Sequence, residues 1–297
     1  MFVMMIDFQY SVIFDLVYHI LAHMKVENAS NLYSEDYINL ISRSKNETES
    51  SLLKEVEKIT GFYNDHFERL AIVNFLPCYC STLEELKNVL LTYNDFTVED
   101  EDRFIVPLCN IMKKEFNFYE SYWLNVYSET RADRIYLEEW MKARFFKYEP
   151  LFLYFKKQAN IVFSYSLTCN GRGYYQKNSF NAVAPFILDQ NKYNNAFYQL
   201  LHEFTHQFTD CMVATNIKMK DGTHTVSENT VILFDYYLIR TLYPEDLASY
   251  CEWIGTMVNC NCFDENSIVH CFSVDNSINE SLLKLTGDIK EYLVRPI

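Results

Sequence analysis

The sequence predicts a mainly α-helical protein with a small β-sheet, which is an α+β fold. Long stretches between Tyr10 and Lys157 carry apolar residues at three- and four-residue spacing, a pattern typical of amphipathic helices. After Lys157, short segments rich in Val, Phe, Ser and Tyr are typical of strands. The chain of 297 residues is 49% hydrophobic, so it can bury a large core, as one big domain or two of ordinary size.

The first part of the chain, residues 1–157, is predicted to be a helical N-terminal region. Segments such as SSLLKEVEKITGFYNDHFERLAIV and TLEELKNVLLTY show the helical period, with acidic residues near their starts. The apolar N-terminus has no basic residue before Lys25 and is interrupted by Asp7 and Asp15, which argues against a signal peptide or a membrane span. We therefore expect this stretch to be a buried segment of the fold.

The second part, residues 158–297, is predicted to contain the small sheet followed by helices. Two strands are expected in ANIVFSYSLTCN and SFNAVAPFILD, and a turn at Gly171-Arg172-Gly173 would join them as a hairpin. Residues 179–186 are the expected edge strand because Pro185 fits an edge better than a centre, although an internal strand is the alternative. From Asn194 onward the helical period resumes.

Charge and cysteine content exclude some classes of partner. Twenty-six basic and forty acidic residues give a net charge of -14, with no basic run, which argues against nucleic acid and anionic membranes as partners. Nine cysteines cannot all pair internally, so without a signal peptide a reducing compartment is the simpler assumption. A cytoplasmic location is therefore predicted. Nothing in the sequence predicts the oligomeric state.

One short stretch, LLHEFTHQFTD at residues 200–210, carries the clearest chemical signal. On a helix, His202 and His206 lie on one face with Cβ atoms ~5–6 Å apart, so both imidazoles can reach one ion at the ~2.0–2.1 Å typical of zinc to nitrogen. Glu203 lies beside them, where its carboxylate can take a proton from a zinc-bound water. The opposite face is apolar and is expected to pack on the core; its members are Phe197, Leu200, Leu201, Phe204, Phe208 and Cys211.

The segment His202 to His206 resembles the HExxH helix of the zincin metallopeptidases. This resemblance implies that the two histidines bind zinc, that Glu203 is the general base, and that an edge strand before the helix holds a peptide substrate. The metzincin branch continues as HExxHxxGxxH, whereas Thr209 and Met212 stand at those positions here. The gluzincin branch takes its third ligand from the next helix, which implies Glu228, 22 residues beyond His206.

Glu228 also has a purely structural interpretation. Thr225-Val226-Ser227-Glu228 matches a capping box, in which Glu228 would bond back to the backbone of Thr225. The third ligand would then be His224 or Asp235.

The gluzincin pattern is also incomplete in the second helix. That family commonly has Asn before the ligand glutamate and Asp four residues after it, where this chain has Ser227 and Ile232. Asp235 or Asp210 would then orient a zinc-binding histidine.

Peptide hydrolysis also needs a donor that stabilises negative charge on the carbonyl oxygen. We single out His224 and Tyr236 for this role, with Tyr237, Tyr174 and Arg172 as further candidates. The sequence as a whole thus predicts a zinc metallopeptidase that hydrolyses peptide or protein substrates. Two alternatives are a zincin-like metal-binding protein without turnover and a helical interaction protein whose HExxH is fortuitous.

Overall fold

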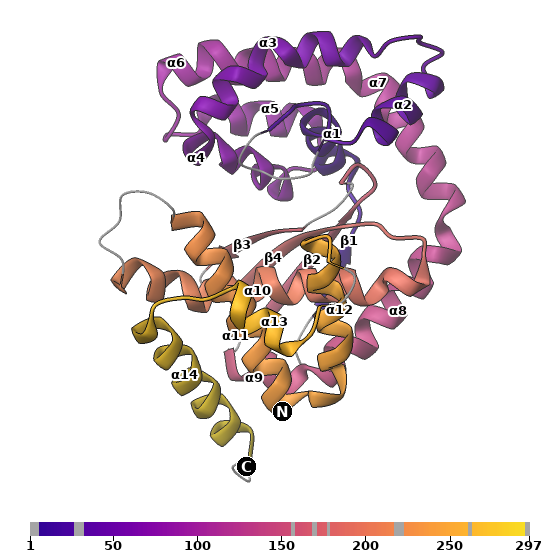
Figure 1. The fold of residues 1–297 in the computed structure, drawn as a ribbon. Coiled ribbons are helices and arrows are strands. Elements are labelled where there is room, and N and C mark those ends of the chain that lie inside the picture. Colours follow the sequence, from indigo (N-terminus) through magenta and orange to yellow (C-terminus); the bar gives the residue numbers. More distant parts are fainter. Residues whose placement is uncertain are drawn as a thin grey trace.

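The computed structural model contains a small mixed sheet between two groups of helices (Figure 1). This architecture confirms the predicted mainly α-helical fold with a small sheet. The structure describes residues 6–26, 33–155, 158–167, 171–176, 179–216, 223–260 and 263–294.

The N-terminal helical layer lies on one side of the sheet. Serine or threonine side chains cap several of its helices, among them Ser11, Ser34, Ser50 and Thr82, each accepting a hydrogen bond from a backbone N–H of the first turn. Residues 13–21 are buried, which confirms that the apolar N-terminal stretch belongs to the core. The layer consists of α1 (Val12–Leu21), α2 (Glu35–Ser44), α3 (Ser51–Asp65), α4 (Phe67–Leu70), η1 (Ala71–Asn74), η2 (Leu76–Tyr79), α5 (Leu83–Thr92), α6 (Val98–Asp100), η3 (Glu101–Ile105) and α7 (Val106–Glu129).

The C-terminal helical layer covers the other face of the sheet (Figure 1). Two of its helices, α8 and α9, precede the second strand in sequence, so both parts of the chain build this layer. Its elements are α8 (Arg131–Lys147), α9 (Glu149–Phe155), η4 (Gln190–Lys192), α10 (Tyr193–Asn216), α11 (Thr223–Leu242), η5 (Pro244–Asp246), α12 (Leu247–Met257), α13 (Glu265–Cys271) and α14 (Asn276–Val294).

The sheet has the strand order β1-β2-β4-β3. Strands β1 (Ile6–Gln9), β2 (Gln158–Ser164) and β4 (Ser179–Pro185) run parallel, and β3 (Arg172–Gln176) is antiparallel to β4. The strand β1 comes from the N-terminal region and pairs with β2.

Two predictions about these strands are wrong. The two predicted strands became β2 and β4, which pair in parallel rather than as a hairpin, because the chain between them supplies a further strand, β3, in place of a turn at Gly171-Arg172-Gly173. The segment 179–186 is therefore internal, and β3 forms the edge on that side of the described sheet. Pro185 is tolerated because it is the last residue of β4.

Both faces of the central strands are buried, and alternate residues face opposite layers. Ile161 and Phe163 of β2 and Ala182 of β4 pack in the C-terminal core. Val162 and Val183 pack in the N-terminal core. The sheet therefore joins the two helical layers through its side chains. Among the described residues, no helix is both long and apolar enough to cross a bilayer.

Candidate metal centre

The helix α10 carries both motif histidines and packs against the sheet and α11. Its predicted apolar face is confirmed at Phe197 and Phe204, which are buried in the C-terminal core, and likewise at Leu200 and Leu201. Cys211, predicted on this face, is exposed, so the prediction is wrong for this residue.

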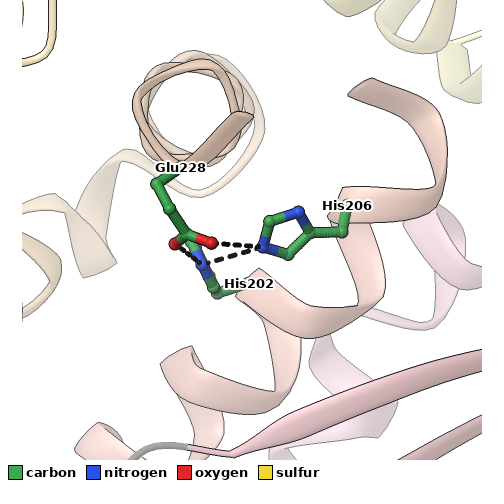
Figure 2. Close-up of side chains that lie close together, drawn as sticks. All are labelled: His202, His206 and Glu228. Carbon is green, nitrogen blue, oxygen red and sulfur yellow. Dashed lines mark hydrogen bonds and ion pairs between the residues drawn. The ribbon is translucent and has the colours of Figure 1, made fainter. Parts of the chain in front are cut away.

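His202, His206 and Glu228 meet where α10 and α11 pack together. Figure 2 shows the carboxylate of Glu228, from α11, pointing at the two imidazoles of α10. The Nε2 atoms of His202 and His206 are 3.2 Å apart. The Glu228 carboxylate lies 3.2 Å from His202 Nε2 through Oε2 and 3.5 Å from His206 Nε2 through Oε1.

The two imidazole nitrogens are separated by about one edge of a tetrahedral metal site. Four ligands at ~2.0–2.1 Å from zinc are about 3.3–3.4 Å from one another in a regular tetrahedron, and the two Nε2 atoms are 3.2 Å apart. A different oxygen of Glu228 approaches each histidine, at 3.2 and 3.5 Å, and one donor atom from each of the three residues lies within 4.8 Å of the others. This spacing is compatible with the three side chains sharing one metal ion. Within the part of the chain that the structure describes, no other group of three His, Cys, Asp or Glu side chains lies this close.

Each histidine has a second carboxylate at its other ring nitrogen. His202 Nδ1 is 3.4 Å from Asp235 Oδ2, and Thr205 Oγ1 donates a 2.6 Å hydrogen bond to Asp235 Oδ1. His206 Nδ1 is 3.5 Å from Asp210 Oδ1. Contacts of this kind orient a histidine ring and would leave Nε2 to face a metal ion. Asp235 and Asp210, the two residues predicted to orient a zinc-binding histidine, therefore each contact one of the two motif histidines.

Ser227 completes this outer arrangement. Its hydroxyl donates a 2.8 Å hydrogen bond to Asp210 Oδ1, so it holds the carboxylate beside His206. The residue that replaces the usual asparagine of the gluzincin pattern thus supports one of the two histidines indirectly.

The electrostatics of the centre favour a positive charge. His202 is almost fully buried, with a side chain 3% exposed. Burial alone would lower its pKa, but the hydrogen bonds and charges of Asp235 and Glu228 outweigh burial and raise the pKa of His202 to about 10. A divalent cation would satisfy the same two carboxylates that otherwise hold this proton.

Glu203 lies between α10 and the edge strand β3. Gln199, one helical turn earlier, donates a 2.9 Å hydrogen bond to Glu203 Oε1, which fixes the carboxylate. The backbone of β3 approaches closely, since a Cβ atom built on Gly173 would lie 3.1 Å from Glu203 Oε2. The spacing of Gln199 to Glu203 is a helical signal that sequence reasoning missed. The sequence analysis predicts a turn at Gly171 and Gly173, although glycine in a strand often marks such a close approach.

The capping-box interpretation of Glu228 does not fit the helix that forms. The helix α11 begins at Thr223, so Thr225 lies inside the first turn and is not its N-cap residue. The side chain of Glu228 instead reaches the two histidines.

Of the residues proposed to stabilise the carbonyl oxygen, Tyr236, Tyr237 and Arg172 are not brought to the three ligands. The hydroxyl of Tyr236 lies between Arg240 and Glu265, at 3.1 and 3.3 Å, and the hydroxyl of Tyr237 donates to Asn279. Gly171 and Gly173 both face α10. Since successive residues of a strand point to opposite faces, the side chain of Arg172 between them points away from α10. The side chains of His224 and Tyr174 are not among those that the structure describes.

This arrangement of two histidines and a glutamate from two packed helices, with Glu203 next to His202 in the sequence, defines a candidate metal centre. No protein-family model matches the chain, and no curated protein or solved structure matches it significantly.

Proposed function

We propose that this protein is a zinc-dependent metallopeptidase of the gluzincin-like type. The observation that supports the proposal is the meeting of His202, His206 and Glu228, of which one donor atom from each lies within 4.8 Å of the others. A zinc ion bound there would lower the pKa of a water to about 7 and polarise a substrate carbonyl.

The residues of the chain then have distinct roles. His202, His206 and Glu228 hold the ion, and Asp235 and Asp210 orient the two imidazoles. Glu203 accepts the proton of the attacking water and delivers it to the leaving amine. Gln199 keeps one carboxylate oxygen of Glu203 bound, and the other, Oε2, lies beside Gly173 of β3.

The edge strand β3 is the better support for an extended substrate now that β4 is internal. A peptide can add to a sheet edge through backbone hydrogen bonds. Since Gly173 of β3 packs against Glu203, a peptide on this edge would pass beside the general base.

The test combines metal analysis with turnover. Purified protein should contain one zinc per chain and hydrolyse members of a peptide library. Glu203→Gln should retain zinc because Glu203 is not a ligand, and should lose activity by about 10²–10⁴-fold because an amide cannot accept the proton. Hydrolysis by Glu203→Gln at the wild-type rate would contradict the mechanism. Stoichiometric zinc without turnover in either protein would favour a metal-binding protein, and absence of zinc would favour a fortuitous motif.

The cytoplasmic location belongs to the same proposal. Six cysteines within the described residues are free thiols: Cys78, Cys80, Cys109, Cys251, Cys260 and Cys271. In a reducing compartment, thiol titration of denatured, unreduced protein should find nearly all nine cysteines reactive. Recovery of several disulfides would place the protein in an oxidising compartment.

A further inference from the structure

A cleft of about 1110 Å³ opens at the carboxyl ends of β2 and β4. Residues directly after these parallel strands line it, including Leu167 after β2 and residues 186–188 after β4. The helix α2 of the N-terminal layer and the helix α12 of the C-terminal layer form its other walls. Crevices beyond the carboxyl ends of parallel strands are common ligand sites in α/β sheets.

Two of the lining side chains touch the metal centre. Gln199 lines the cleft and donates its hydrogen bond to Glu203. Trp253 also lines it, and its ring packs edge-on against His202 with ring centroids 6.1 Å apart. Gln199 lies one helical turn before Glu203, a distance of ~5.4 Å along the helix. An extended peptide spans this distance in fewer than two residues, at ~3.3 Å each. The cleft therefore begins beside the proposed general base and one of the proposed ligands.

The cleft presents apolar side chains that the core does not use. Leu188, Leu40 and Met257 are 60%, 49% and 38% exposed. Together with Phe186, Ile187 and Trp253 they form an apolar wall. Covering such exposed apolar surface stabilises a complex by roughly 25 cal/mol per Å² buried.

Charged groups at the cleft are few and mixed. Asp36, Asp189 and Lys192 line it, so two carboxylates oppose one ammonium group. This balance disfavours an acidic side chain in the same place.

We propose that this cleft binds a bulky apolar side chain of the peptide substrate, located within two residues of the scissile bond. The proposal rests on the proposed peptidase function. It assigns substrate selection to α2, α12 and the segment after β4, none of which supplies a metal ligand.

The first experiment measures selectivity. Paired peptides carry Phe or Ser at each of the two positions on either side of the scissile bond, and kcat/KM is compared. Phe should be preferred over Ser by ~10-fold or more at one of these positions. Leu188→Glu and Met257→Glu place a charge on exposed positions of the wall and should reduce this ratio several-fold. Val98→Glu, at a 74% exposed residue outside the cleft, is the matched control and should leave the ratio unchanged. A ratio unaffected by both cleft variants would overturn the proposal.

The second experiment separates this proposal from the peptidase function. Calorimetry measures binding of the same peptides to the Glu203→Gln protein, which needs no turnover. Tighter binding of the Phe peptide, weakened by Met257→Glu, supports the cleft even if the wild-type protein hydrolyses nothing. Equal binding of the Phe and Ser peptides rejects the cleft, even where the wild-type protein is an active zinc peptidase.

Discussion

At the residue scale, the metal centre depends on pairing each histidine with two carboxylates that act at different ring nitrogens. Asp235 approaches Nδ1 of His202 while Glu228 approaches Nε2, so the ring is held from both sides. Asp235 is fully buried and is held by Thr205, whereas the side chain of Glu228 is 32% exposed. The buried carboxylate thus holds the ring at Nδ1, and the accessible one faces the position that we propose for the ion.

Glu228→Gln tests the role of the accessible carboxylate. Glutamine keeps the size of the side chain but removes the charge that offsets Zn²⁺, and two histidines with waters bind zinc far more weakly than a three-ligand site. We expect Glu228→Gln and Glu228→Ala to lose zinc on dialysis against a mild chelator while circular dichroism shows a folded protein. The measurement is the zinc content per chain after dialysis.

The matched control for this test is Glu252→Gln, on an exposed residue of α12. It should retain zinc as the wild-type protein does. If the Glu228→Gln protein also retains its zinc, the third ligand is His224 or Asp235 and the gluzincin-like assignment is wrong.

At the element scale, the close packing of β3 on α10 positions Glu203, the proposed general base. A Cβ on Gly171, directly before β3, would lie 2.7 Å from the carbonyl oxygen of Val183 and 2.9 Å from Gln199 Cγ. Glycine is therefore required there by space, and the neighbouring Gly173 brings the strand backbone to Glu203. The strand and the helix can approach this closely only because both positions lack a side chain.

Gly171→Ala should destabilise the protein by about 1–3 kcal/mol, because the added methyl group forces β3, β4 or Gln199 to shift. Urea unfolding measures the change in the free energy of unfolding. Gly61→Ala is the control, since Gly61 lies in α3 with open space around its Cβ position, and it should stabilise the protein by roughly 0.5–1 kcal/mol. Equal effects of the two substitutions would show that β3 does not pack on α10 as described.

At the scale of the whole molecule, the sheet is the shared layer between two helical groups, and Asp15 ties the N-terminal group to it through buried polar contacts. Asp15 of α1 accepts hydrogen bonds from Trp123 Nε1 of α7 at 2.7 Å and from the backbone N–H of Tyr165, directly after β2, at 3.1 Å. Burial raises the pKa of this carboxyl from 3.8 to about 6. One titratable group therefore links α1, α7 and the end of β2.

The raised pKa of Asp15 predicts the pH dependence of stability. The folded state binds this proton more tightly than the unfolded state, so the stabilisation is present below about pH 4 and is lost as the pH rises through about 6. Asp15→Asn should remove this pH-dependent contribution. The free energy of unfolding of Asp15→Asn relative to wild type should therefore increase as the pH rises from about 4 to about 6. Urea unfolding at several pH values measures it, with exposed Asp288→Asn as the control. A stability difference between Asp15→Asn and wild type that does not change with pH would contradict the assignment.

Local periodicity was enough to predict much of the fold and part of the candidate metal centre. A helix brings residues four apart to one face whatever its surroundings, so the sequence alone predicted that His202 and His206 lie together with Glu203 beside them. The structure agrees, with the two Nε2 atoms 3.2 Å apart. The predominance of helices followed from the same periodicity.

Pairing between distant segments was decided only by the tertiary structure. The alternation of apolar residues in β2 and β4 indicates two faces but not which strand lies beside which, so the hairpin prediction was wrong and β3 was missed. In the same way, helical spacing left Glu228, His224 and Asp235 open as third ligand. The packing of α11 on α10 brings Glu228 to Nε2 and Asp235 to Nδ1 of His202, because contacts between helices depend on how their surfaces fit and not on spacing within either one.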